Sequence, residues 1–329
     1  MKHARKFVSL VLGLAMMLSM NTAAFASEYE DAGTVTLSKT YQLTNDGTTS
    51  PAETFQFSAL TCVGVENAGV GVTTENAPIP TIGDIEYAEG EAGSGTATKN
   101  VEITLPTYNA VGVYTYSFTE TDGGTAGVTY RSDAMKLVVT VIQEADGKVR
   151  VAAIHTENED GAKSDDFVNT YSAGSLAIRK TVAGNLGDQE KEFHATVTFT
   201  APEGDTVRGT ISYVDGDESK TISPAVWADG TATAEITLTH DETVTFTNIP
   251  YGVTYTVVET EANQDGYTTT YEGENGTVSA ASQNTTITNT KGAEVDTGIY
   301  TDSLPYIVLL GVAVAGVAVY IAKKRFVNE

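Results

Sequence analysis

The chain is poor in cysteine and in basic residues. Its 329 residues include one cysteine, Cys62, so an intramolecular disulfide cannot reinforce it. We predict that Cys62 packs as a small hydrophobic side chain near Leu60 and Val63. Lysine and arginine number 19 against 43 aspartates and glutamates, giving a formal net charge of −24. This acidity argues strongly against nucleic acid or an anionic membrane surface as a partner.

The middle of the chain also lacks any long amphipathic helical pattern. Its 31 glycines, 16 tyrosines and abundant threonine and valine indicate an all-β chain. The length is sufficient for two domains with hydrophobic cores of their own. Ser172-Ala173-Gly174 is small and flexible and is followed at once by a new strand pattern, so we predict domains at 27–172 and 173–293.

Residues that would hold a metal or carry out turnover are missing as well. The histidines His155, His194 and His240 show no metal-ligand spacing. The stretch Asp215-Gly216-Asp217-Glu218 fits a hairpin turn better than a cation site. Gly69-Val70-Gly71 lacks the strand-turn-helix context of a phosphate loop, and no Ser/His/Asp arrangement supports hydrolysis. The sequence therefore predicts neither a metal nor a cofactor.

Both ends of the chain carry export signals. Lys2, Arg5 and Lys6 precede an apolar run, and Ala24-Phe25-Ala26 fits a small-x-small cleavage site, which predicts a signal peptide at 1–26. At the other end, an apolar run at 304–322 is long enough to span a bilayer, and the basic tail at 323–329 should stay in the cytoplasm. Read alone, this second run could equally be a permanent single-span anchor.

One strand, Gly112–Glu120, poses a chemical problem. Tyr114, Tyr116 and Phe118 share a face with Glu120, because residues of one parity in a strand point to the same side. Buried carboxylates are rare unless they are paired or neutral. Glu120 is therefore either a solvated strand end or a group whose task needs a low dielectric.

A repeat of this pattern favours the second alternative. Tyr-x-[Phe/Val]-x-Glu-Thr occurs at 116–121 and again at 255–260. In each half a lysine interrupts the apolar row of the first strand, and an asparagine lies in apolar phase in the last strand. Matching accidents at six positions are improbable. The two sets of three residues are Lys39, Glu120 and Asn169, and Lys180, Glu259 and Asn289.

These residue types can form a covalent bond when they are held together. Burial lowers the pKa of a lysine, and a neutral amine is a nucleophile. Lys39 could attack the side-chain carbonyl of Asn169 while Glu120 polarises it and moves protons, which releases ammonia and leaves an isopeptide bond. Lys180, Glu259 and Asn289 would react in the same way. The reaction happens once, so the chain is not predicted to be an enzyme.

The C-terminal region adds a processing motif. Glu294-Val295-Asp296-Thr297-Gly298 precedes the apolar run and is similar to the sorting signals Leu-Pro-x-Thr-Gly and Glu-Val-Pro-Thr-Gly, with Asp296 in place of proline. Together with the two sets of three residues, this motif makes the chain resemble the two-domain, T-antigen-type major pilins of Gram-positive bacteria. The resemblance covers nearly the whole precursor.

The resemblance implies a fold and a function. It implies two tandem immunoglobulin-like β-sandwich domains, Lys–Asn bonds at the six residues above, catalytic roles for Glu120 and Glu259, and cleavage by sortase between Thr297 and Gly298. Lys163 lies six residues before Asn169, as the acceptor lysine does in similar pilins, and it competes for that role with the other exposed lysines.

The expected function is that of the shaft subunit of a cell-wall pilus. The partners implied are a pilin-type sortase, neighbouring copies of the chain, minor pilins and peptidoglycan, with transient membrane anchoring of the precursor. The alternative is a wall-anchored adhesin or minor pilin that is not polymerised. A secreted enzyme would be a third reading, but the sequence offers no turnover site for it.

Overall fold

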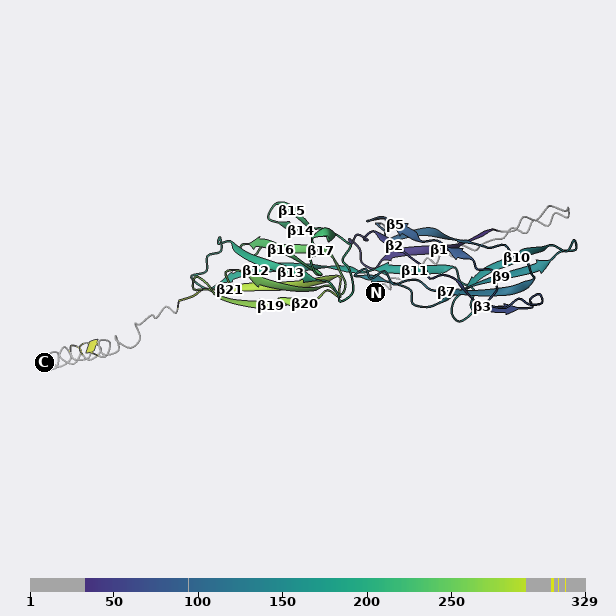
Figure 1. Cartoon of the computed structure of the whole chain (residues 1–329). Coiled ribbons are helices and arrows are strands. Elements are labelled where there is room, and N and C mark those ends of the chain that lie inside the picture. Colours follow the sequence, from purple (N-terminus) through teal and green to yellow (C-terminus); the bar gives the residue numbers. More distant parts are fainter. Residues whose placement is uncertain (1–32, 94, 294–308, 311–312, 314–316, 318–329) are drawn as a thin grey trace, which may run out of the picture.

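The computed structural model describes residues 33–93, 95–293, 309–310, 313 and 317. Nearly all of its regular structure is β-strand, arranged as two β-sandwiches that lie end to end (Figure 1). This confirms the all-β prediction. Among the described residues, no helix is long and apolar enough to cross a membrane. The predicted signal peptide at 1–26, the predicted sorting motif at 294–298 and the predicted tail at 323–329 lie outside these residues, as does most of the apolar run at 304–322.

The first sandwich is built from two main sheets and a two-stranded ribbon. In hydrogen-bonded order, one sheet contains β4 (Thr81–Ile82), β6 (Thr96–Thr104), β1 (Thr34–Leu43), β11 (Asp166–Tyr171) and β8 (Val128–Thr129). The facing sheet contains β10 (Val149–Glu157), β9 (Met135–Gln143), β7 (Gly112–Phe118) and β3 (Thr61–Glu66), and the ribbon pairs β2 (Glu53–Phe55) with β5 (Ile85–Tyr87).

The second sandwich has two sheets and a short 3-10 helix, η1 (Pro224–Val226). One sheet contains β15 (Glu218–Ile222), β14 (Ile211–Asp215), β17 (Thr243–Pro250), β12 (Ala173–Ala183), β21 (Ser282–Thr290) and β19 (Thr268–Glu272). The other contains β16 (Thr231–Leu238), β13 (Phe193–Thr200), β18 (Thr254–Glu259) and β20 (Asn275–Thr277).

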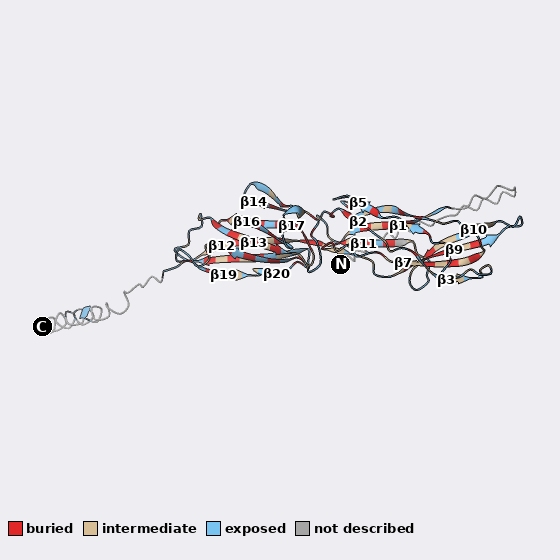
Figure 2. Ribbon diagram, viewed as in Figure 1, coloured by how far each residue is buried: buried red, intermediate tan, exposed pale blue. Residues whose placement is uncertain are grey.

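Alternation of buried and exposed side chains explains the strands. In β7 every second residue is buried, and the same alternation runs along β12 and β13, whose buried positions are red in Figure 2. The hairpin turn predicted between Asp215 and Glu218 is confirmed, because these residues close the β14–β15 pair. Residues 56–60 belong to neither neighbouring strand, because β2 ends at Phe55 and β3 begins at Thr61.

First and last strands lie side by side in both sandwiches. β1 pairs with β11, and β12 pairs with β21, and both pairs are parallel. All other pairs of strands are antiparallel. A parallel pair requires a long crossover connection, and here that connection is the rest of the domain.

The two sandwiches are joined by more than a linker. Ala126 of the first half is 1% exposed and packs in the hydrophobic core of the second half. Its neighbour Thr125 forms a parallel bridge with Thr206, and the backbone N–H of Tyr251 donates to the carbonyl of Ser172 over 2.9 Å. These three contacts across the junction hold the halves in one orientation.

Asn248 of β17 provides a further test of this junction. Its φ angle is +61°, its Oδ1 accepts from the backbone N–H of Thr49 over 2.9 Å, and its Nδ2 donates to the carbonyl of Thr210 over 3.0 Å. Replacing Asn248 by Ala should lower the free energy of unfolding by about 1–3 kcal/mol for the unpaired groups, plus about 1–2 kcal/mol for the left-handed backbone.

Urea unfolding of the mature chain checks this value. Asn248→Gly is the matched control, because glycine accepts the positive φ and should show only the hydrogen-bond loss. Equal stability of the Ala variant and the parent chain would contradict the proposed contribution of Asn248.

Candidate functional site

Strand register brings a lysine and an asparagine together in each sandwich. Lys39 of β1 lies opposite Phe167, and Asn169 lies opposite Tyr41, two positions farther along the same face. In the second sandwich Lys180 lies opposite Ile287, and Asn289 lies opposite Val182. The offset between lysine and asparagine is the same in both pairs. Each lysine therefore reaches one pleat repeat along the neighbouring strand.

The glutamate of each set comes from the facing sheet. Glu120 follows the buried row of β7 and bridges to Phe57, so the strand pattern continues past Phe118. Glu259 is the last residue of β18. Both glutamates are buried, with exposures of 7% and 2%. Each carboxylate thus enters the space between the sheets where the lysine and the asparagine meet.

In the first set, Glu120 contacts both the amine of Lys39 and the side-chain amide of Asn169. Its Oε1 lies 2.7 Å from the Nζ atom of Lys39, and its Oε2 accepts from Nδ2 of Asn169 over 2.7 Å. The backbone N–H of Arg131 also donates to Oε2, over 2.6 Å. Lys39 Nζ donates in turn to Oδ1 of Asn169. One carboxylate therefore touches the amine with one oxygen and the amide nitrogen with the other.

The second set repeats this bridge with fewer contacts. Lys180 donates to Oε2 of Glu259, and Nδ2 of Asn289 donates to Oε1 over 2.6 Å. Lys180 and Asn289 are both 0% exposed. Within the described part of the chain, Oδ1 of Asn289 is buried and accepts no hydrogen bond. The carboxylate again spans the amine and the amide nitrogen.

Burial changes the protonation of both lysines. Desolvation lowers the pKa of Lys39 from 10.5 to about 8, although the nearby Glu120 charge opposes the shift. Desolvation also lowers the pKa of Lys180, against the hydrogen bond and charge of Glu259. A lower pKa increases the fraction of neutral amine near neutral pH, and the neutral amine is the form that can attack a carbonyl carbon.

Sequence reasoning missed an aromatic ring beside each lysine. The Nζ atom of Lys39 lies 4.0 Å from the centre of the Phe55 ring, and Nζ of Lys180 lies 4.1 Å from that of Phe193. Phe55 and Phe193 lie in the ribbon strand β2 and in β13. Only an aromatic residue in apolar phase was visible in either stretch, which does not identify its contact. By excluding water, each ring lowers the pKa of its lysine, and by attracting the charged ammonium it raises that pKa, so the two effects oppose each other.

Lys163 lies apart from these sets, between β10 and β11. Its side chain is exposed, and it follows a turn in which the N–H of Gly161 donates to the carbonyl of Asn158. Its backbone forms an isolated antiparallel β-bridge with that of Glu157. Its ammonium has no partner among the described residues, whereas five other lysines contact acidic side chains or carbonyl oxygens. These are Lys99, Lys136, Lys148, Lys191 and Lys220. The sorting-motif residues Glu294, Val295, Asp296, Thr297 and Gly298 lie outside the described residues.

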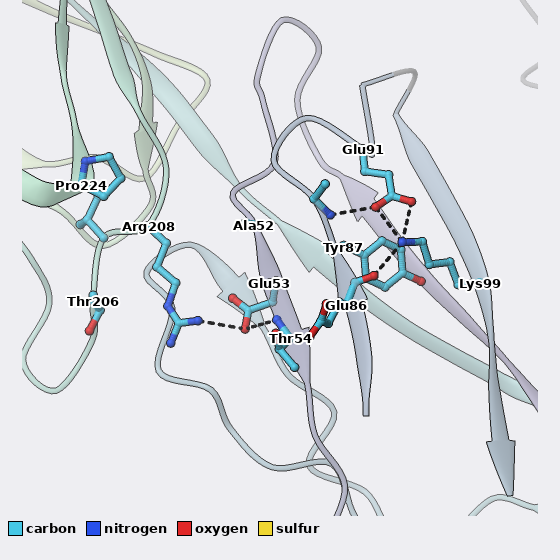
Figure 3. Close-up of a pocket in the computed structure, with 12 residues that line it drawn as sticks. Ala52, Glu53, Thr54, Glu86, Tyr87, Glu91, Lys99, Thr206, Arg208 and Pro224 are labelled. Atoms are coloured by element: carbon cyan, nitrogen blue, oxygen red, sulfur yellow. Dashed lines mark hydrogen bonds and ion pairs between the residues drawn. The ribbon is translucent and has the colours of Figure 1, made fainter. Parts of the chain in front are cut away.

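A cleft of about 780 Å³ lies between the sandwiches, and none of the six residues of the two sets lines it (Figure 3). Arg208 enters it from the second half and lies 3.7 Å from the buried Glu53, while Lys99 lies 2.7 Å from Glu91. Its cations are thus paired with acids of the same chain. The part of the chain that the structure describes contains no cluster of histidine, cysteine and carboxylate side chains suited to a metal ion.

Known families match the two halves separately. Residues 35–172 match a family described as a Spy0128-like isopeptide containing domain, and residues 174–291 match a domain of unknown function, DUF7601. A protein described as a pilin, from Streptococcus pyogenes serotype M1, is 26% identical over 336 residues, which is 96% of this chain and 98% of that protein.

Solved structures show the same fold. The major pilin from Streptococcus pyogenes is 23% identical, with a TM-score of 0.55 over 80% of this chain and 100% of that chain. The major pilin T3.2 from serotype GAS13637 is 22% identical, with a TM-score of 0.50 over 79% of this chain and 100% of that one. The chain therefore shares its fold with these proteins.

The lowered pKa of Lys39 predicts that stability depends on pH in a variant whose Lys39 keeps a free amine. In Glu120→Ala the lysine stays buried without its anionic partner, so its pKa should be at or below about 8. An unfolded lysine stays protonated up to pH 10.5, so above pH 8 the unfolded chain binds more protons and the free energy of unfolding rises with pH. Urea unfolding should give a value about 1–3 kcal/mol higher at pH 9 than at pH 7.

The control is the double variant Lys39→Met, Glu120→Ala, which has no buried amine to titrate. The same rise in both variants would assign the pH dependence to other groups.

Proposed function

We propose that this chain, whose residues 35–172 match the family of Spy0128-like isopeptide containing domains, is the repeating shaft subunit of a covalent pilus on a Gram-positive cell. The observation that carries the proposal is the duplicated buried contact of lysine, glutamate and asparagine between the first and last strands. The likeness to a pilin over 96% of the chain supports it.

Each set of three residues would close its domain by forming an isopeptide bond. The lone pair of Lys39 Nζ attacks the side-chain carbonyl carbon of Asn169, and Glu120 Oε1 takes a proton from the amine. The bond from that carbon to Nδ2 then breaks, and Nδ2 leaves as ammonia with a proton supplied through Glu120. Lys180, Asn289 and Glu259 do the same in the second domain. An amine and a primary amide thus become a secondary amide and ammonia, without any co-reactant.

Proximity supplies much of the rate. Amides are inert towards amines in water, but reactants held by a packed core can gain about 7–11 kcal/mol from orientation alone. The first bond would close a loop of 130 residues. A disulfide of similar span stabilises a protein by about 4–5 kcal/mol in the chain-entropy treatment, and the bond would act in the place of the disulfides that this chain lacks.

Polymerisation would join the opposite ends of two copies. Sortase cleaves after Thr297 and transfers its carbonyl to Lys163 of the next copy. Lys163 precedes β11, which runs towards the second domain, whereas β21 runs away from the junction towards the sorting motif. Lys163 and the C-terminal end of β21 thus lie on opposite sides of the domain junction, as a head-to-tail polymer requires.

The precursor segments fit this route. We assign 1–26 to a signal peptide, 27–172 and 173–293 to the two pilin domains, 294–298 to the sorting motif, 304–322 to a transient membrane span and 323–329 to a cytoplasmic tail. The polymer would be attached to the cell wall, with a pilin-type sortase, minor pilins and peptidoglycan as partners.

Two bonds predict a mass. The mature chain should be lighter than its sequence by two molecules of ammonia, because each bond releases one. Intact mass spectrometry of Glu120→Ala and of Glu259→Ala should each recover one of these losses. A mature chain whose mass equals that calculated from its sequence, with no loss of ammonia, would contradict the proposed chemistry.

The acceptor predicts a polymer defect. Lys163→Ala should abolish the high-molecular-weight ladder in cell-wall extracts, because the nucleophile for transfer is removed. Lys148→Ala is the matched control, since Lys148 is another exposed lysine of the first domain, at the opposite end of β10, with a side-chain exposure of 85%. A ladder that survives in Lys163→Ala but not in the control variant would move the junction to Lys148.

A further inference from the structure

The course of the chain decides which bond carries tension in such a polymer. This inference rests on the proposed function: force enters a copy at Lys163 and leaves it at Thr297, because these are the residues joined to its neighbours. The covalent path between the two points can be followed along the described strands from Lys163 to Asn289.

In the first domain this path avoids the proposed bond. From Lys163 the backbone passes through β11 and Ser172 directly into β12. Asn169 lies on the path in β11. Lys39 would be bonded to it from the neighbouring strand β1, which is not part of the path. Residues 33–162 are therefore attached to the path but carry no tension, whether or not Lys39 is bonded to Asn169.

In the second domain the path crosses the proposed bond. β12 runs away from the junction and brings the chain to Lys180. β21 is parallel to β12 and continues in the same direction from Asn289 towards the C-terminal end. The bond passes force from one strand to the other without reversing its direction. Residues 181–288 are then left out of the path.

We propose that the two bonds have different mechanical tasks. The bond of Lys180 and Asn289 carries the load between subunits, and the bond of Lys39 and Asn169 stabilises the first domain without carrying it. The path consists of strand segments that are already extended at about 3.3 Å per residue, so it has little length left to give. If the second bond is absent, force must pass through residues 181–288 and unfold them.

Single-polymer force spectroscopy tests this difference. Polymers of the mature chain carrying Glu259→Ala should lengthen by on the order of 35 nm per subunit when the second domain unfolds. Polymers carrying Glu120→Ala should lengthen no more than the parent polymer, even though their first domain is less stable. Asn289→Ala provides a second variant that lacks the loaded bond but keeps the glutamate.

A change in the point of attachment is the control. When a monomer is held by its N-terminus and C-terminus, force enters through β1, so Glu120→Ala should now add on the order of 40 nm. Lengthening of Glu120→Ala polymers whose junction is at Lys163 by mass spectrometry would overturn the division of tasks, as would Glu259→Ala polymers that do not lengthen. A junction at another lysine, or an unaltered monomer mass, would instead overturn the proposed function.

Discussion

The parallel contact between the first and last strands of each domain is the constraint on which the structure depends. It places the first and last strands of a domain side by side, with the chain entering at one end of the domain and leaving at the other, and it lets a buried lysine reach an asparagine on the neighbouring strand. A lysine there would be costly without a partner, because its charge has left water. The glutamate from the facing sheet offsets this cost by pairing with the lysine, and the pair links the two sheets at that point.

The two sites share a plan but differ in their surroundings. Glu120 accepts a backbone hydrogen bond from Arg131 in addition to its two reacting partners. Glu259 is held instead through its own backbone N–H, which donates to the hydroxyl of Tyr271 over 3.1 Å. The common element is therefore the carboxylate bridge between amine and amide, and the supporting contacts are particular to each domain.

Much of this site follows from the sequence, because alternation in strands shows which side chains face inwards. Lys39, Glu120 and Asn169 lie in apolar phase, and their repetition in the second half marks them as a set. The rings of Phe55 and Phe193 were not predicted, since their contacts with the lysines depend on how separate strands pack. The strands β15, β19 and β20 are hard to predict for a related reason: they are short and rich in polar residues, so they lack a clear apolar alternation. Contacts at the domain junction, such as that of Ala126, leave no periodic signal at all.

The insertion of Ala126 into the second core has a consequence for bending. A junction held by a buried residue, a strand bridge and backbone hydrogen bonds resists a hinge motion, because any tilt would expose Ala126 and break the pairing of Thr125 with Thr206. Each subunit should then behave as a single stiff segment two domains long. A fibre of such segments would curve where one copy meets the next, so its flexibility would be set by the number of subunits along it.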